Sequence, residues 1–238
     1  MVKFSIITVS LNSENTIERC LNSVLNQTFK DYEHIVIDGA SSDSSLDIIK
    51  KFSHVKCISE KDSGIYDAMN KGVLKSSGQY IIFLNSDDEF LSDFLLECDK
   101  LGEVDFISNA INMIDGNHIR VWSPRLLKKS GFIWSMPIPH AGLVVKRSVF
   151  TKIGLFDLNF RIAADFDFVI KLLQSNYVGK INNKPLMNFY LGGISNNYKI
   201  LNENNLVRTK HFKDIFKLKL AYSLDLLRYF KNNILQLK

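Results

Sequence analysis

The chain has 238 residues, of which 46% are hydrophobic and 23% are charged, a composition that excludes a disordered or collagen-like protein. Its three cysteines, Cys20, Cys57 and Cys98, lie far apart, which argues against a disulfide scaffold and a structural zinc site and favours a reducing compartment. The net charge is +5, but residues 207–238 alone carry +6, so the basic character belongs to the C-terminal segment.

The first hundred residues alternate strand and helix patterns. Apolar, β-branched runs predict buried strands over 3–10, 33–38, 55–59 and 80–84, and helical spacing predicts helices over 14–26, 46–49 and 65–76. This order predicts an α/β fold with an open, mostly parallel sheet flanked by helices. The part over 102–200 is less regular, with a strand expected over 141–146 and a helix over 166–174.

Polar side chains follow three of the predicted strands. Ser10 and Asn12 follow the first, Asp38 ends the second, and the stretch 85–88 (Asn-Ser-Asp-Asp) follows the fourth. Ligands of open parallel sheets bind beyond the carboxyl ends of the strands. Several carboxylates at one edge need a cation or hydrogen bonds as partners. We therefore expect a binding site at this edge.

The adjacent carboxylates Asp87 and Asp88 suit a hard divalent ion such as Mg²⁺, which takes one or two carboxylates and completes its shell with phosphate oxygens and water. Such an ion would stabilise a diphosphate leaving group. The alternative is an acidic loop that caps the next helix. The segment 37–45 contains neither GxGxxG nor a P-loop, and Ser42 or Asp43 is expected to start the next helix there.

Two long segments carry a resemblance to a known family. They are TVSLNSENTIERCLNSVLNQTFKDYEHIVIDGASSDSS and EKDSGIYDAMNKGVLKSSGQYIIFLNSDD, and PHAGLVVKRSVFTKIGLFDLNFRIAADFDFVIKLL continues the match more weakly. Together they resemble a family 2 glycosyltransferase of the GT-A fold. The resemblance implies a UDP-sugar donor, Mg²⁺ or Mn²⁺ as cofactor, and transfer with inversion at the anomeric carbon.

The resemblance also assigns roles in donor binding. Asp38 is similar to the aspartate that contacts the uracil, and Asp62 to a second acid near the base or ribose. An acid that favours the helix N-terminus is the alternative for Asp62. Asp87 and Asp88 take the place of the DxD motif, but Ser86 stands where a first aspartate is common. This leaves Asp88 as the expected metal ligand, with Asp87 at the metal or near the ribose.

On the acceptor side, Asp165 falls where the resemblance places the general base, although Ala164 replaces the usual glutamate. Asp167 is a rival, and a helix cap is the other reading of Asp165. His140 is expected near the metal or diphosphate, or else as a buried, hydrogen-bonded residue. The glycines at 192–193 and the serine at 195 are a weaker candidate for closing over the diphosphate.

The segment 207–238 has apolar residues three or four positions apart, bordered by lysines and arginines. This pattern predicts a basic amphipathic helix that lies on an anionic membrane surface. A helix packed on the domain with a solvated basic face fits the pattern nearly as well. Nucleic acid is not an expected partner, because the site edge is acidic.

These observations predict one GT-A catalytic domain over 1–206, with a nucleotide-sugar-binding half (1–100) and an acceptor half (101–206), followed by the tail over 207–238. The short N-terminal apolar run is no signal peptide, and no stretch is long enough to span a membrane. We expect a protein at the inner face of the cytoplasmic membrane that uses a lipid-linked saccharide acceptor in O-antigen or exopolysaccharide synthesis. The alternatives are an inactive scaffold of this family and a nucleotidyltransferase on a related fold.

Overall fold

The computed structural model describes residues 2–125, 129–192 and 198–235. Its first half has the predicted order of elements, namely β1 (Phe4–Ser10), α1 (Ile17–Leu25), β2 (Tyr32–Asp38), α2 (Ser45–Ile49), β3 (Val55–Ser59), α3 (Ile65–Lys75) and β4 (Tyr80–Asn85). These four strands pair in parallel in the order β3-β2-β1-β4. The predicted parallel sheet is therefore confirmed.

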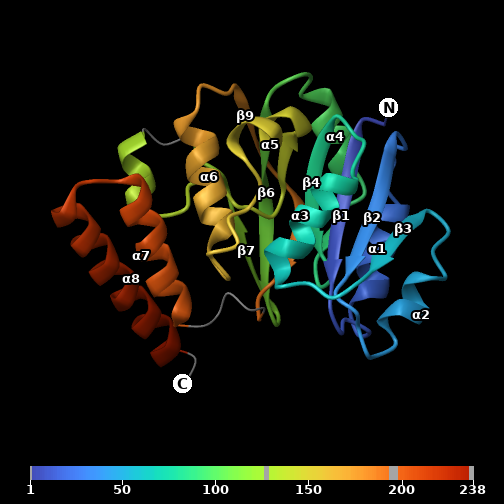
Figure 1. The fold of residues 1–238 in the computed structure, drawn as a ribbon, viewed down its shortest axis with the longest axis horizontal. Helices are drawn as coiled ribbons and strands as arrows, with labels where there is room; N and C mark the ends of the chain where they lie inside the picture. The colour runs from blue at the N-terminus through green and yellow to red at the C-terminus, as the bar shows by residue number, and fades with distance from the viewer. Residues whose placement is uncertain (1, 126–128, 193–197, 236–238) are drawn as a thin grey trace.

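The second half extends the same sheet with mixed strand directions (Figure 1). Its elements are β5 (Glu89–Phe90), α4 (Phe94–Lys100), β6 (Phe106–Asp115), β7 (His118–Trp122), η1 (Lys129–Ile133), β8 (Leu143–Lys146), α5 (Arg147–Ile153), α6 (Ala164–Gln174) and β9 (Gly179–Tyr190). Strand β8 joins the halves, because it pairs antiparallel with both β4 and β6. Sequence patterns missed the long strands β6 and β9, because β6 mixes polar with apolar residues and the first half of β9 is mostly polar and partly exposed.

Helices cover both faces of the sheet, so the central strands carry apolar side chains on both faces. Along β1, Ile6 packs on the face covered by α1 and α4, whereas Ile7 packs on the face covered by α3. All seven residues of β1 are buried. A strand buried on both faces loses the alternation of a half-exposed strand, and this explains the continuous apolar runs in the sequence.

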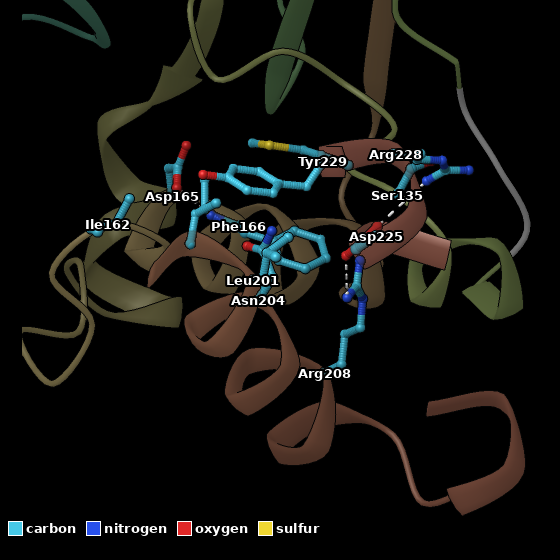
Figure 2. A pocket seen from close by; sticks show the side chains of 12 residues that line it. Ser135, Ile162, Asp165, Phe166, Leu201, Asn204, Arg208, Asp225, Arg228 and Tyr229 are labelled. Carbon is cyan, nitrogen blue, oxygen red and sulfur yellow. Dashed lines mark hydrogen bonds and ion pairs between the residues drawn. The ribbon is translucent and has the colours of Figure 1, made fainter. Parts of the chain in front are cut away.

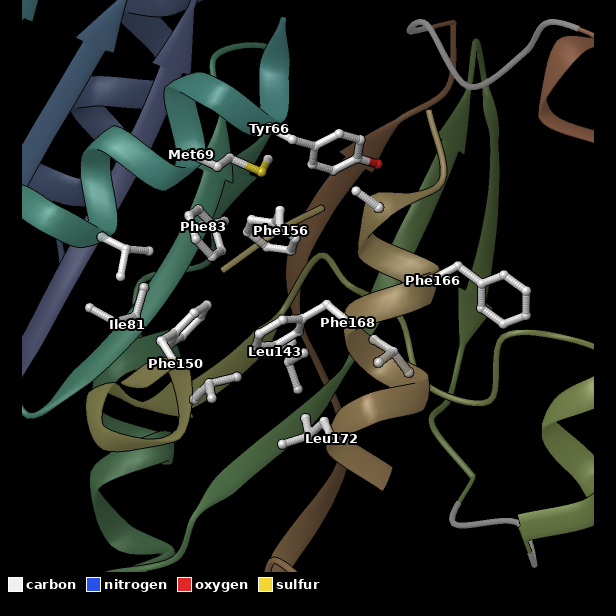
Figure 3. Packing of buried hydrophobic residues seen from close by; sticks show 14 of the residues in the cluster. Tyr66, Met69, Ile81, Phe83, Leu143, Phe150, Phe156, Phe166, Phe168 and Leu172 are labelled. Carbon is white, nitrogen blue, oxygen red and sulfur yellow. The ribbon is translucent and has the colours of Figure 1, made fainter. Parts of the chain in front are cut away.

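A cluster of aromatic side chains fixes α6 against the first half of the chain (Figure 3). Phe168 of α6 stacks on Phe150 with ring centroids 4.8 Å apart and lies 5.1 Å from Phe156. Phe156 in turn contacts Phe83 of β4 at 5.3 Å and Tyr66 of α3 at 5.4 Å. Aromatic contacts of this kind bury large areas and have specific geometry. The cluster therefore sets the start of α6 relative to α3 and to the end of β4.

The C-terminal segment forms two helices at the far end of the molecule from α1 and α2 (Figure 1), namely α7 (Lys199–His211) and α8 (Ile215–Leu235). The expected boundary after residue 206 lies inside α7, whose Val207 is part of the main core. Helix α8 buries Leu218 and Ala221 and contacts α7 and η1. Within the described ranges, none of the helices is both long enough and apolar enough to cross a membrane.

Candidate functional site

A cleft of about 830 Å³ lies beyond the carboxyl ends of β1 and β4 and reaches the start of α6. It is the kind of concave site expected at the carboxyl edge of an open α/β sheet. Seven residues singled out from the sequence line it: Ser10, Asn12, Asp62, Asp87, Asp88, His140 and Asp165. Residues from both halves of the chain thus meet in one cavity.

Asp88 is fully buried at the end of β4, where the chain turns into β5. Its Oδ1 accepts a hydrogen bond from the backbone N–H of Tyr190 at 2.9 Å, and its Oδ2 accepts one from Asn85 Nδ2 at 3.3 Å. Burial, with Asp87 beside it, raises the pKa of Asp88 to about 8, and burial raises the pKa of Asp87 as well. Neither carboxylate caps α4, which starts at Phe94.

These two carboxylates fit a divalent cation. A cation would offset the cost of keeping two neighbouring negative charges in a site that water reaches poorly. Each carboxylate oxygen of Asp88 keeps a lone pair for a metal after its hydrogen bond. Among the described side chains, no group of three or more His, Cys, Asp or Glu residues could hold a metal. A pair of carboxylates suits Mg²⁺ or Mn²⁺, because such an ion takes one or two carboxylates and accepts phosphate oxygens and water as further ligands.

Asp38 does not reach the cleft wall, unlike the other expected donor-binding residues. It is fully buried and accepts hydrogen bonds from the backbone N–H of Ser41 (3.0 Å), from Ser41 Oγ and from Ser59 Oγ (2.7 Å). In this arrangement Asp38 holds the turn after β2. A direct contact with a base stays a prediction, and it would require the carboxylate to exchange one of these bonds.

Asp62 lies against the same turn and does line the cleft. Its Oδ1 accepts a hydrogen bond from the N–H of Gly64, the residue before α3, so the cleft position and the helix-start position are compatible. A Cβ atom at Gly39 would lie only 2.6 Å from Asp62 Oδ2. Glycine at position 39 therefore leaves the space that the Asp62 carboxylate occupies.

The end of β1 offers hydrogen-bonding groups to the cleft. Ser10 is buried, and its Oγ has no hydrogen-bond partner within the described parts of the chain. A buried hydroxyl without a partner is uncommon and suits a site that a ligand completes. Asn12 has a φ of 51° and binds the neighbouring turn, because its Oδ1 accepts from the N–H of Ser42 at 2.9 Å. Its left-handed backbone is one that asparagine tolerates.

Asp165 lies in the first turn of α6, with one carboxylate oxygen held by the protein. Its Oδ1 accepts hydrogen bonds from Tyr66 Oη at 2.9 Å and from the N–H of Phe166 at 2.8 Å. Tyr66 Oη also lies 2.8 Å from the carbonyl oxygen of Ile162. Oδ2 has no hydrogen-bond partner that the described structure records, so it is available to a hydroxyl in the cleft.

The other acid of this helix, Asp167, points elsewhere. It is fully buried, lines no described cavity, and binds His211 Nε2 at 2.7 Å, Lys171 Nζ at 2.8 Å and Lys210 Nζ at 2.9 Å. Burial alone would raise its pKa, but these hydrogen bonds hold the pKa of Asp167 below its usual value. Asp167 therefore joins α6 to α7, and Asp165 is the acid of this helix that faces the cleft.

His140 lines the cleft next to the aromatic cluster. Its ring stacks on Phe83 with centroids 5.6 Å apart and meets Phe156 edge-on at 5.5 Å. Burial lowers the pKa of His140, and the nearby Asp165 opposes that effect only partly. A neutral imidazole at neutral pH can donate or accept one hydrogen bond to a ligand but brings no charge to a diphosphate.

The sequence reasoning missed two residues that position Asp165. Tyr66 lies inside the IYDAMN stretch, and its hydroxyl reaches Asp165 from α3. Glu203 lies on α7, and its carboxylate accepts hydrogen bonds from the backbone N–H groups of residues 161–163. No spacing rule could have linked position 203 to position 162. Of the weaker candidates, Gly192 is exposed and positions 193 and 195 lie outside the described residues.

Comparison with known proteins shows which proteins this chain is similar to. The family description "Glycosyl transferase family 2" matches residues 5–101. A PGL/p-HBAD biosynthesis glycosyltransferase of Mycobacterium tuberculosis H37Rv is 31% identical over 188 residues, which cover 72% of this chain and 70% of the relative. An uncharacterized glycosyltransferase of Nostoc is 28% identical over 204 residues, covering 74% of this chain and 63% of the relative.

Solved structures show the same fold at lower identity. TarS 1–349 of S. aureus in complex with UDP-GlcNAc has a TM-score of 0.69 at 19% identity, covering 96% of this chain and 73% of that one. The chain spans 41% of the longer TarS structure. The mannosyltransferase PcManGT of Pyrobaculum calidifontis, in complex with GDP-Man and Mn²⁺, has a TM-score of 0.69 at 17% identity, covering 94% and 69% of the two chains.

Proposed function

This chain belongs to glycosyltransferase family 2 and is a nucleotide-sugar-dependent enzyme, and we propose that it moves a hexose or N-acetylhexosamine from a UDP-sugar, with inversion, to a lipid-linked glycan acceptor. The observation that carries the proposal is one cleft lined by the Asp87–Asp88 pair, by Asp62 and by Asp165. Bacterial O-antigen or exopolysaccharide synthesis is the proposed setting, at the inner face of the cytoplasmic membrane.

The proposed reaction is a single displacement at the anomeric carbon. The acceptor oxygen forms a bond to that carbon as the bond to the diphosphate oxygen breaks, and UDP leaves with the bonding electron pair. Asp165 Oδ2 takes the proton of the acceptor hydroxyl, while Tyr66 and the N–H of Phe166 hold Oδ1. A divalent ion bound at Asp88, with Asp87 beside it, would neutralise the charge that develops on the diphosphate.

A coupled assay of UDP release tests this function. UDP-Glc, UDP-Gal, UDP-GlcNAc and UDP-GalNAc are each incubated with washed membrane lipid as acceptor and Mn²⁺. We expect acceptor-dependent UDP release from one of them and little from the Asp165→Asn variant. An inactive scaffold would release no UDP from any donor. A nucleotidyltransferase would instead release pyrophosphate from UTP and a sugar phosphate.

Membrane association is part of the proposal and has its own support. Helix α8 packs one side on the protein and exposes apolar residues on the other: Ile215 (68% exposed), Phe216 (78%), Leu220 (43%) and Leu227 (66%). Lys213, Lys217 and Lys219 are exposed on the same segment. An apolar strip among lysines is the pattern of a helix that binds an anionic lipid surface.

Vesicle co-sedimentation tests this surface separately. Phe216→Ser should weaken binding to vesicles that contain phosphatidylglycerol and leave the melting temperature unchanged, because Phe216 is mostly exposed. High salt should weaken binding of the wild type, since it screens the attraction. Val178→Ser removes another mostly exposed apolar side chain (63% exposed) outside the tail and serves as the control. Equal binding by both variants would contradict the membrane assignment.

A further inference from the structure

A second cavity of about 360 Å³ lies behind Asp165, between α6, α7, α8 and the segment after η1 (Figure 2). Its size falls within the range of small-molecule sites, about 300–1,000 Å³. Four residues line both this cavity and the donor cleft: Met136, Ile162, Asp165 and Ile200. Asp165 therefore lies where the two cavities meet, and Figure 2 shows Tyr229 of α8 extending toward the Asp165 side.

The wall of this cavity contains a buried ion pair with unused hydrogen-bonding capacity. Arg208 is 2% exposed, and its Nη1 lies 2.7 Å from Asp225 Oδ2 on α8. Among the described residues, however, Arg208 Nε has no hydrogen-bond partner, and the close Nη1–Oδ2 contact of the ion pair does not meet hydrogen-bond geometry. Burying an arginine and a carboxylate is costly unless their remaining donors and acceptors are satisfied. Such groups in a cavity wall point to a ligand that completes them.

The charges of the lining define the ligand. Arg208 and Arg228 would repel a cation, and Asp225 and Asp165 would repel an anion. A neutral molecule with several hydroxyl groups suits both the positive and the negative side chains of the wall, because each hydroxyl can donate to a carboxylate and accept from a guanidinium. The half-buried Asn204 adds an amide to the wall. Phe166, Leu201 and Met136 add apolar surface for the C–H faces of a sugar ring.

We propose that this cavity is the acceptor subsite and binds the terminal sugar of the acceptor glycan, with its reactive hydroxyl at Asp165. The inference rests on the proposed glycosyltransferase function and adds the place and the chemistry of acceptor binding. It also gives the C-terminal tail a second role. Helix α8 supplies Asp225, Arg228 and Tyr229 to the wall, so the tail is part of the substrate-binding machinery as well as the proposed contact with lipid.

Saturation-transfer NMR with simple glycosides tests the subsite. The probes are the methyl glycosides of glucose, galactose, mannose, rhamnose and the two N-acetylhexosamines, each added to the full chain with UDP and Mn²⁺. We expect at least one to bind the wild type. Asn204→Leu and Asp225→Asn should each weaken that binding at least tenfold. Asn204→Leu keeps a similar volume at a half-buried position, so it reports on the subsite if the Asp225 variant folds poorly.

The control and the donor measurement separate the possible outcomes. Lys219→Ala removes a charge from the same helix outside the cavity and should bind the glycoside as the wild type does. Calorimetric titration of UDP should be unchanged in all three variants. If the wild type binds UDP but none of the glycosides, or if both cavity variants bind them normally, the cavity is only a packing void and the inference fails. If the wild type binds no UDP, the proposed function itself fails. Preferential binding of inorganic phosphate in the cavity would overturn the assignment to a neutral sugar.

Discussion

Replacing Glu203 with alanine removes the carboxylate that holds the backbone just before Asp165. Glu203 Oε2 accepts hydrogen bonds from the N–H groups of Ile162 at 2.7 Å and Ala163 at 3.0 Å, and Oε1 accepts one from Arg161 at 3.2 Å. Helix α6 has no side-chain cap of its own, since Ala163 stands at the N-cap position. The N–H groups at the start of a helix need partners, and Glu203 of α7 supplies one to the N-cap residue Ala163, while its other two bonds hold the segment that leads into the helix.

The geometry gives the size of the effect. A hydrogen bond to a charged group contributes about 1.5–3 kcal/mol, and the shortest of the three bonds is the one from Ile162 at 2.7 Å. Water can replace part of this interaction, because Arg161 is exposed and Ile162 is half-buried. We therefore expect a loss of about 2–4 kcal/mol in the free energy of unfolding, which lowers the melting temperature by roughly 4–16 °C in a chain of this size. Glu203→Gln keeps one acceptor oxygen, so its free energy of unfolding should lie between those of the wild type and Glu203→Ala.

The functional effect follows from displacement of Asp165. A catalytic group moved by about 1 Å can cost about 10²-fold in rate, so kcat should fall by roughly 10–100-fold. UDP affinity should stay unchanged, because Glu203 does not line the donor cleft. Differential scanning calorimetry and steady-state kinetics measure the two effects. Glu18→Ala on α1 removes an exposed carboxylate and should change neither. Wild-type melting and turnover in Glu203→Ala would refute the reasoning.

Three further predictions concern single side chains. Asp165→Asn should lower kcat by about 10²–10⁴, the scale of general-base removal, with UDP affinity retained; an equal loss of UDP affinity would place Asp165 on the donor side. Asp88→Asn should abolish Mn²⁺-dependent turnover and leave a protein at least as stable as the wild type, because the pKa of Asp88 near 8 means that its charge is costly in the fold; full wild-type activity in EDTA would contradict the metal site. Glu33 is held by Ser5, Ser77 and Lys56, and although burial opposes them, these bonds lower its pKa from 4.5 to about 2. Because this pKa is lowered in the fold, the charged Glu33 carboxylate stabilises the folded state fully above pH 4.5. This stabilisation is lost as the pH falls from 4.5 toward 2, at about 1.4 kcal/mol for each pH unit. Urea unfolding should therefore show Glu33→Gln to be about 2–3 kcal/mol less stable than the wild type at pH 7, with a gap that narrows below pH 4.5; a gap independent of pH would contradict this.

The amino-acid sequence was enough to predict the order of strands and helices in the first half and the sheet edge where the site lies. The reason is that both signals are local. Continuous apolar runs identify strands buried on two faces, and the polar residues directly after them must lie at the carboxyl edge of a parallel sheet. Ser10, Asn12, Asp87 and Asp88 were found in this way, and all four line the cleft.

The choice between Asp165 and Asp167 required the packing of α6 in the fold. Residues two positions apart lie on nearly opposite sides of an α-helix, so one of the pair had to face away from the site. Which one depends on the aromatic cluster that orients α6 and on where α7 packs with His211 and Lys210. The same holds for Asp38, which the sequence places at the edge but which Ser41 and Ser59 keep inside the fold.

The C-terminal tail shows most clearly what a local sequence pattern leaves undetermined. Its spacing of apolar and basic residues fits a helix on a membrane and, nearly as well, a helix packed on the protein, because amphipathicity fixes the faces of a helix but not what covers them. The fold divides the segment into α7 and α8, buries Val207, Leu218 and Ala221, and leaves Phe216 exposed. Long-range contacts such as Arg208 with Asp225 and Glu203 with Ile162 join positions whose proximity exists only after the chain has folded, and no local pattern encodes them.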